Sequence, residues 1–205
     1  MAYAAMTKEE AQHSIRTFYE AVKIGILLMG NELKVNEKII RLMVGFITDV
    51  GNMDGIVYYA RPDLALGSGF GTAISTQGGP RVQEELKKLG KANTTEVVVT
   101  GGGNLQAKYI LHAVGPRFQE EDSEEKLGKT MLNALRKAED HQMQKIVFPA
   151  MGAGFYGIPL EVCARVTLEA AKAFLGNNST LREVVFCLRD SRELKVFQAY
   201  LQKMM

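Results

Sequence analysis

Residues 145–159 read KIVFPAMGAGFYGIP, an apolar run that is followed by three glycines within six positions. Residues 145–148 are typical of a buried strand. Glycine is costly to order and has no side chain to pack, so Gly152, Gly154 and Gly157 predict a loop whose backbone approaches another group closely. In an open α/β sheet, ligands bind beyond the carboxyl ends of the strands. We therefore expect this stretch to end a strand at a ligand-binding edge.

Strand-like and helix-like stretches alternate through the rest of the chain. Several expected strands are near-continuous apolar runs, which belong to sheets covered by helices on both faces. The expected strands lie at residues 38–47, 55–60, 95–101, 107–115, 145–150 and 182–188. The expected helices lie at residues 80–90, 123–141, 160–175 and 192–204, with a shorter one near 72–77. This order predicts an α/β protein with a three-layer α/β/α fold.

The chain divides into an N-terminal segment, residues 1–35, and one α/β domain, residues 36–205. Thr7 can cap a helix, and apolar residues follow at helical spacing from Ile15 to Met29. This pattern predicts an extra amphipathic N-terminal helix that packs on the domain. A homodimer formed through the same helix is the alternative.

Composition narrows the functional classes. Of 205 residues, 46% are hydrophobic and 23% charged, and the net charge is +2 without a dense Lys/Arg patch, so nucleic acid is not an expected partner. The absence of a signal-peptide pattern and of a bilayer-length apolar run predicts a soluble, cytoplasmic protein with no membrane partner. Cys163 and Cys187 are expected to be buried, reduced thiols. The three histidines are too scattered for a metal site, so neither a metal nor a cofactor is expected.

Two more glycine clusters resemble the one in the opening stretch. Residues 67–71 read GSGFG, and residues 101–103 are three consecutive glycines after the run EVVVT. Neither contains a Walker sequence or a dinucleotide-binding fingerprint. Each cluster alone can be a plain connector, but three that follow strands of one sheet are expected to converge on one edge. Together they predict a ligand with a diphosphate that is held mainly by backbone N–H groups.

Residues 38–203 resemble the macro domain family. The resemblance is strongest in YILHAVGPRF, residues 109–118, and in IVFPAMGAGFYGIP, residues 146–159. It implies an α/β/α fold around a mixed sheet. The stretches GSGFGTAISTQGG and FCLRDSRELKVFQAYLQ look closer to the histone-type macro domains than to the hydrolase branch.

The resemblance also implies a pocket for ADP-ribose or a related NAD-derived nucleotide. In that pocket the loop of the opening stretch would wrap the diphosphate and the distal ribose, with Tyr156 lining the ribose. The loop around Gly69 would close the other side. The implied ligand-binding residues are Phe46, Ile47, Gly67, Ser68, Gly69, Phe70, Gly71, Met151, Gly152, Ala153, Gly154, Phe155, Tyr156, Gly157, Arg189 and Asp190.

The end of the pocket that would hold the base departs from the family pattern. Family members carry an aspartate that accepts a hydrogen bond from the adenine amino group, and the matching residue here is Phe46. The backbone of Ile47 could still contact the ring edge. The family places an aromatic residue before an aspartate on its last strand, where this chain has Arg189 and Asp190. A guanidinium can stack on a base, although a solvated Arg189 is the alternative.

The positions that would carry catalysis also depart from the family pattern. The hydrolase branch has two asparagines and an aspartate at the positions of Tyr58, Arg61 and Gly71. Asp63 is a weak candidate for a catalytic base, and a turn-forming role suits it better. His112 is expected to be a core histidine.

Three functions remain open on the sequence. The first is a module that binds ADP-ribose or a related nucleotide without efficient catalysis, and the missing catalytic residues favour it. The second is a hydrolase that acts on ADP-ribosyl esters or on phosphorylated ADP-ribose. The third is a degenerate macro fold that serves as a protein-interaction module.

Overall fold

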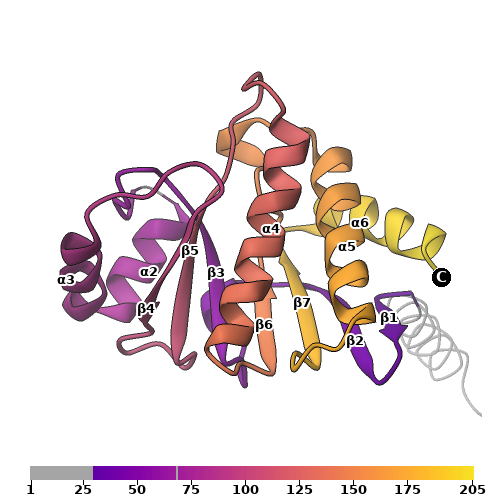
Figure 1. Ribbon diagram of the computed structural model, residues 1–205, viewed down its shortest axis with the longest axis horizontal. Helices are drawn as coiled ribbons and strands as arrows, with labels where there is room; N and C mark the ends of the chain where they lie inside the picture. The colour runs from indigo at the N-terminus through magenta and orange to yellow at the C-terminus, as the bar shows by residue number, and fades with distance from the viewer. Residues whose placement is uncertain (1–29, 68) are drawn as a thin grey trace, which may run out of the picture.

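The computed structural model describes residues 30–67 and 69–205 (Figure 1). Its centre is a seven-stranded mixed sheet in the order β1-β2-β7-β6-β3-β5-β4. The strands are β1 (Glu32–Val35), β2 (Lys38–Val44), β3 (Gly55–Ala60), β4 (Val97–Gly101), β5 (Tyr109–Val114), β6 (Lys145–Phe148) and β7 (Glu183–Leu188). The helices are α2 (Phe70–Gly78), α3 (Pro80–Leu89), α4 (Ser123–Asp140), α5 (Leu160–Gly176) and α6 (Ser191–Lys203), with short 3-10 turns η1 (Ile47–Asp49) and η2 (Gly154–Tyr156).

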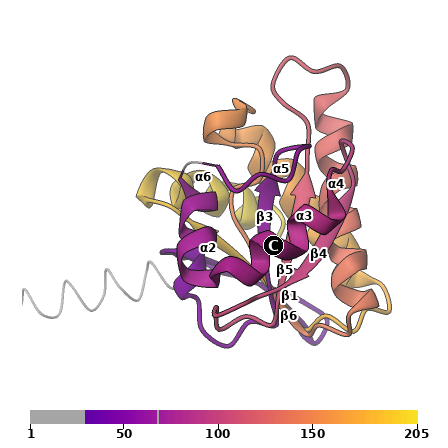
Figure 2. The ribbon, with the colours of Figure 1, turned by 90° about the vertical axis from the view of Figure 1, so that its left-hand side faces the viewer.

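Helices cover both faces of the sheet. One buried cluster packs α4, α5 and α6 against the strands, with Leu127, Leu168 and Phe197 among its fully buried side chains. A second cluster packs η1, α2 and α3 against the other face, with Ile74 and Val82 at its centre. Figure 2 shows α2 and α4 on opposite sides of the strands. The predicted three-layer α/β/α fold and mixed sheet are therefore confirmed. No helix in the described part of the chain is long and apolar enough to cross a bilayer.

All six expected strands form, but β1 was not expected. Residues 32–35 were assigned to the N-terminal segment, whereas the structure pairs them antiparallel with β2, from Glu32↔Arg41 to Val35↔Lys38. A strand of four residues, ELKV, is too short to stand out from its surroundings as a pattern. The helix expected before it falls on residues 1–29, which lie outside the described residues.

Strand direction decides which loops share an edge. β2, β7, β6, β3 and β5 pair in parallel, so their carboxyl ends meet at one edge of the sheet. β4 is antiparallel to β5, so it ends at the opposite edge. The expectation that all three glycine clusters converge was therefore wrong for residues 101–103. A Cβ at Gly102 would lie 1.9 Å from the Ala107 carbonyl oxygen, and one at Gly103 would lie 2.0 Å from that of Gly78. These glycines allow backbone segments to pack closely.

His112 is a core residue, as the sequence predicted. Its side chain on β5 is fully buried, and Nε2 lies 2.9 Å from the hydroxyl oxygen of Thr100 on β4. The pKa of His112 is lowered from 6.5 to about 4, because burial disfavours the charged imidazolium. The histidine is therefore neutral in the folded protein at neutral pH.

We predict an acid-sensitive stability that His112 controls. The unfolded chain binds a proton at this residue below about pH 6.5 and the folded chain only near pH 4, so the free energy of unfolding falls as the pH drops through this window. The full loss is about 3 kcal/mol at 1.36 kcal/mol per pKa unit. Chemical denaturation of His112→Asn at several pH values should show a flatter slope.

The control for this experiment is His141→Asn, which removes a half-buried ring that meets Tyr109 edge-on, leaves His112 in place and should retain the slope of the wild type. An equal slope in His112→Asn and the wild type would contradict the assignment.

Candidate functional site

Four segments that are distant in the sequence meet at the carboxyl edge. Residues 46–47 follow β2, residues 189–190 follow β7, residues 151–157 follow β6, and residues 67–71 follow β3. These segments contain every residue that the sequence predicted to bind the ligand, and only Ser68 lies outside the described residues. A fifth loop, residues 115–122 after β5, reaches the same edge and was not predicted as part of the site.

The sheet opens between β3 and β6 toward this edge. Their ladder joins only Gly55 with Ile146 and Ile56 with Val147, while β3 continues to Ala60 beside β5. The chain then leaves β3 toward α2 on one face and leaves β6 toward α5 on the other face. Strands whose connections depart to opposite faces mark the topological switch point, which is where open α/β sheets bind ligands.

The three glycines after β6 have different local roles. Gly152 has φ of 82°, and a Cβ there would lie 2.7 Å from Ile158 Cδ1. Gly157 has φ of 76° and packs against Phe118, whose backbone N–H donates to the Tyr156 carbonyl oxygen at 2.8 Å. Gly154 has φ of 69°, and a Cβ there would meet nothing within 4 Å. Gly152 and Gly157 shape the loop, and Gly154 leaves open space in front of its backbone.

The loop on the β3 side is equally open. Added Cβ atoms at Gly67 and Gly69 would meet nothing within 4 Å. Gly69 has φ of 67° and precedes α2 without a side chain that caps the helix. The first backbone N–H groups of α2 therefore lack intrahelical partners and can donate to an anion.

The predicted ligand-binding residues differ in whether their side chains or only their backbone atoms can contact a ligand. The Met151 side chain is fully buried and Ile47 is nearly so, so either residue could offer only its backbone. By contrast, Phe46 is 78% exposed and Phe155 is 85% exposed, both unusually open for aromatic residues.

Three tyrosines lie near these loops. Tyr59 and Tyr156 belong to the cluster that packs α4, α5 and α6 on the sheet, and Tyr58 belongs to the cluster on the other face. The Tyr59 hydroxyl donates to the Pro116 carbonyl oxygen at 2.6 Å, and its ring meets Tyr156 edge-on with centroids 4.6 Å apart. Tyr58 meets Phe70 edge-on at 5.8 Å. The sequence predicted only Tyr156 here. Tyr58 and Tyr59 end a parallel strand, a position that could have pointed to them.

The titratable groups at this end are poorly suited to take up a proton at neutral pH. Burial raises the pKa of the Tyr58, Tyr59 and Tyr156 phenols, so they stay neutral. The Asp63 pKa is lowered, first because its carboxylate accepts from the Ala65 N–H and then because it pairs with Arg61. Asp63 thus has the role of a turn former at an exposed rim.

Tyr58 and Gly71 are coupled through space. A Cβ at Gly71 would lie only 2.6 Å from the Tyr58 hydroxyl oxygen and 3.2 Å from Cζ of the same ring. The phenol therefore fills the volume that a side chain at position 71 would need. Tyr58 is compatible with glycine at position 71 and with little else.

Arg189 at the other end is held by a buried carboxylate. Glu193 Oε2 accepts from the Arg189 backbone N–H at 2.8 Å, and Oε1 lies 3.4 Å from Nη2 of the guanidinium. Asp190 accepts from the backbone N–H groups of Arg192 and Glu193 and so caps α6. These hydrogen bonds lower the Asp190 pKa.

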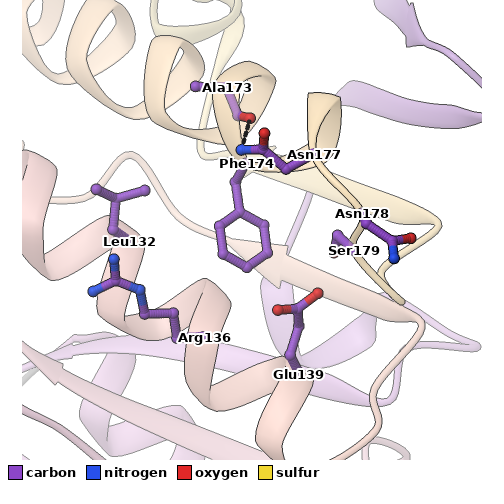
Figure 3. A pocket seen from close by; sticks show the side chains of 8 residues that line it. All are labelled: Leu132, Arg136, Glu139, Ala173, Phe174, Asn177, Asn178 and Ser179. Atoms are coloured by element: carbon purple, nitrogen blue, oxygen red, sulfur yellow. Dashed lines mark hydrogen bonds between the residues drawn. The ribbon is translucent and has the colours of Figure 1, made fainter.

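A hollow of about 240 Å³ lies between α4 and α5, away from this edge (Figure 3). It is near the ends of both helices that precede β6 and β7, so it belongs to the amino edge of the sheet. Glu139 in this hollow already accepts from the Thr180 backbone N–H, and Asn177 donates to the Ala173 carbonyl oxygen. Within residues 30–67 and 69–205, no cluster of three or more His, Cys, Asp or Glu residues could hold a metal ion.

Comparison with known proteins identifies the family. A family model of the macro domain matches residues 60–167. The chain belongs to the macro domain family. An uncharacterized protein of Saccharolobus solfataricus is 38% identical over 164 residues, which cover 78% of this chain and 90% of that protein. A macro domain-containing protein of Caldanaerobacter subterraneus is 37% identical over 77% of this chain and 93% of its own length.

Solved macrodomain structures share the fold. The Oceanobacillus iheyensis macrodomain with ADP superposes with a TM-score of 0.80 and 27% identity, covering 84% of this chain and 95% of that one. The Trypanosoma brucei macrodomain in complex with ADP-ribose has a TM-score of 0.73 and 29% identity, covering 78% of this chain and 68% of that one.

The contact between Tyr58 and Gly71 predicts a strong mutational coupling. Alanine normally stabilises a helix relative to glycine by about 1 kcal/mol, but Gly71→Ala should cost about 1–3 kcal/mol because the added methyl group overpacks against the phenol. Removing the nearest atom with Tyr58→Phe should lower that cost by about 1 kcal/mol. Denaturant unfolding of the two single variants and the double variant measures the coupling.

Gly176→Ala at the end of α5 is the matched control, since a Cβ there would meet nothing within 4 Å. It should not destabilise the protein. Strictly additive effects of Tyr58→Phe and Gly71→Ala would contradict the contact.

Proposed function

We propose that this macro domain binds ADP-ribose or a related NAD-derived nucleotide between residues 67–71 and residues 151–157. The observation that carries the proposal is the pair of open glycine loops at the switch point. Added Cβ atoms at Gly67, Gly69 and Gly154 would all meet open space, and these glycines belong to the two loops that flank the switch point. Related macrodomains have been solved with ADP and with ADP-ribose, which supports the same class of ligand here.

The diphosphate would lie over the N-terminus of α2. Backbone N–H groups of its first turn and of the loop around Gly154 would donate to the phosphate oxygens, and the helix dipole would add a favourable field. Such a site needs neither a metal nor a lysine clamp. The distal ribose would then reach Tyr156, and the base would reach Phe46 and Arg189.

The residues at the end of the site that would hold the distal ribose favour binding without efficient turnover over hydrolysis. Tyr58 fills the space beside Gly71, and the neighbouring phenols have raised pKa values. A hydrolase would need a base in contact with a water molecule, and Asp63 is tied to Ala65 and Arg61 instead. We therefore favour a binding module of the histone type over a hydrolase of ADP-ribosyl esters or phosphorylated ADP-ribose, and over a module that binds only protein.

The proposal also covers the role of the N-terminal segment and the cellular location of the protein. Residues 1–35 would contribute a helix that packs on the domain or pairs two copies, in addition to β1. We place the protein in the cytoplasm, where NAD-derived nucleotides are available.

The phosphate loop can be tested with Gly154→Glu. A carboxylate in the open space should repel the diphosphate and weaken ADP-ribose binding by at least about 100-fold, since like charges brought together cost several kcal/mol. Isothermal titration calorimetry of the full chain measures the loss, and an assay for released ADP-ribose should detect no turnover of an ADP-ribosyl ester.

Gly90→Glu is the matched control. Gly90 has φ of 77°, also faces open space and follows α3, outside the two proposed loops at residues 67–71 and 151–157. Gly90→Glu imposes a backbone strain similar to that of Gly154→Glu and should leave the affinity for ADP-ribose unchanged. Equal affinity in folded Gly154→Glu would contradict the phosphate loop, and wild-type protein that binds no ADP-ribose at about 1 mM would contradict the proposed function.

A further inference from the structure

The chain that leads into α2 has few side chains of its own to hold it in place. Added Cβ atoms at Gly67 and Gly69 would meet nothing within 4 Å, and Gly69 precedes α2 without a side chain that caps the helix. Thr72 Oγ1 donates to the Gly67 carbonyl oxygen at 3.0 Å, but this bond is local and does not tie the segment to the sheet. Glycine loses more conformational freedom on folding than any other residue. A contact from the sheet can therefore decide where the first turn of α2 lies.

Tyr58 on β3 makes that contact. A Cβ at Gly71 would lie 2.6 Å from the Tyr58 hydroxyl oxygen, and the Tyr58 ring meets Phe70 edge-on with centroids 5.8 Å apart. Burial raises the pKa of the Tyr58 phenol, and the Gly67 backbone lies close enough to the phenol oxygen to oppose part of that rise by hydrogen bonding. One side chain thus reaches the segment at Gly67 and again at Gly71.

Tyr58 is itself held from below. The residue is only 7% exposed, and the parallel ladder pairs it with His112 on β5. The two rings meet edge-on with centroids 6.1 Å apart. His112 is fully buried, and its Nε2 lies 2.9 Å from the hydroxyl oxygen of Thr100 on β4. A line of contacts therefore runs from the edge of the sheet through three strands to the start of α2.

We propose that Tyr58 is a positioning residue for the diphosphate, which holds the first turn of α2 where its backbone N–H groups can donate to the phosphate oxygens. Tyr58 acts through the helix and not by touching the ligand. This inference rests on the proposed function, because the start of α2 must be where the diphosphate binds. Without the phenol, the first turn is in place in only a fraction of the molecules, and the dissociation constant rises in inverse proportion to that fraction.

The burial of Tyr58 separates this role from a direct contact with the ligand. Tyr58 belongs to the cluster beneath α2, together with the fully buried Ile74. A residue that touched the distal ribose would affect the binding of ADP-ribose and leave that of ADP unchanged. A residue that positions the helix should affect both ligands equally, because both carry the diphosphate.

The first experiment measures affinity. Calorimetric titration of the full chain with ADP and with ADP-ribose should show a loss of about threefold in Tyr58→Phe, the typical worth of one hydrogen bond. Tyr58→Leu, which also removes the ring, should lose about tenfold, as expected if about a tenth of the molecules keep the first turn in place. Unchanged affinity in Tyr58→Phe would overturn the inference, and so would a loss for ADP-ribose that ADP does not share.

The second experiment measures rates. Surface plasmon resonance with ADP should show that the association rate constant of Tyr58→Phe falls by the same factor as the affinity, since fewer molecules are competent to bind. The dissociation rate constant should be unchanged, because the bound state keeps all its contacts with the ligand. Faster dissociation with unchanged association would overturn the inference, since it would show that Tyr58 contacts the ligand directly.

Tyr109→Phe is the matched control. Tyr109 begins β5 at the amino edge of the sheet, where its ring meets His141 edge-on at 5.2 Å. Removing its hydroxyl should leave the affinity for ADP and ADP-ribose unchanged. Melting curves should show that each variant is folded at the temperature of the titration, and Tyr58→Phe keeps the inference testable if Tyr58→Leu does not fold. An equal loss of affinity in Tyr109→Phe and Tyr58→Phe would contradict a specific role for Tyr58.

The outcomes separate the two proposals. If the wild type binds ADP-ribose and the Tyr58 variants bind it equally well, only the inference about Tyr58 falls. If the wild type binds neither ADP-ribose nor ADP at about 1 mM, the proposed function falls and the inference falls with it.

Discussion

The short pairing between β3 and β6 is the constraint on which the site depends. These strands share only two residue pairs, and beyond them β3 is held by β5 while β6 is held by β7. Because the following helices pack on opposite faces, the two exit loops leave the edge toward opposite sides of the sheet. The open glycines matter because the topology places their loops on either side of this switch point.

The sequence predicted the fold and the loop after β6 for physical reasons that can be named. Apolar runs and residues at helical spacing predicted the strands and helices that form the three layers. The glycine cluster between a strand and a helix predicted the loop after β6. Strand direction left no such trace, since VVVTG reads alike in parallel and antiparallel strands. Residues 101–103 were therefore assigned to the wrong edge, although their glycines are needed for close packing against Ala107 and Gly78.

The packing of Tyr58 against Gly71 could not be predicted from either residue alone, because it depends on the volume of the tyrosine side chain. Taken separately, Tyr58 and Gly71 are each a position at which the hydrolase branch of the family has a polar residue. In space the phenol of Tyr58 occupies the volume that glycine leaves free, so the two positions form one packed unit. The same holds for Gly115, where a Cβ would lie 2.1 Å from the Tyr59 hydroxyl oxygen. The end of β3 is thus surrounded by aromatic packing, and the Tyr58 and Tyr59 phenols stay neutral there because burial raises their pKa values.

The proposed binding mode divides recognition between the backbone and the side chains around it. Backbone N–H groups at the start of α2 and around Gly154 would bind any diphosphate equally, because they would contact only phosphate oxygens. Selectivity for the rest of a nucleotide would then have to come from side chains beside these loops. Affinity in such a site should therefore depend mainly on the diphosphate.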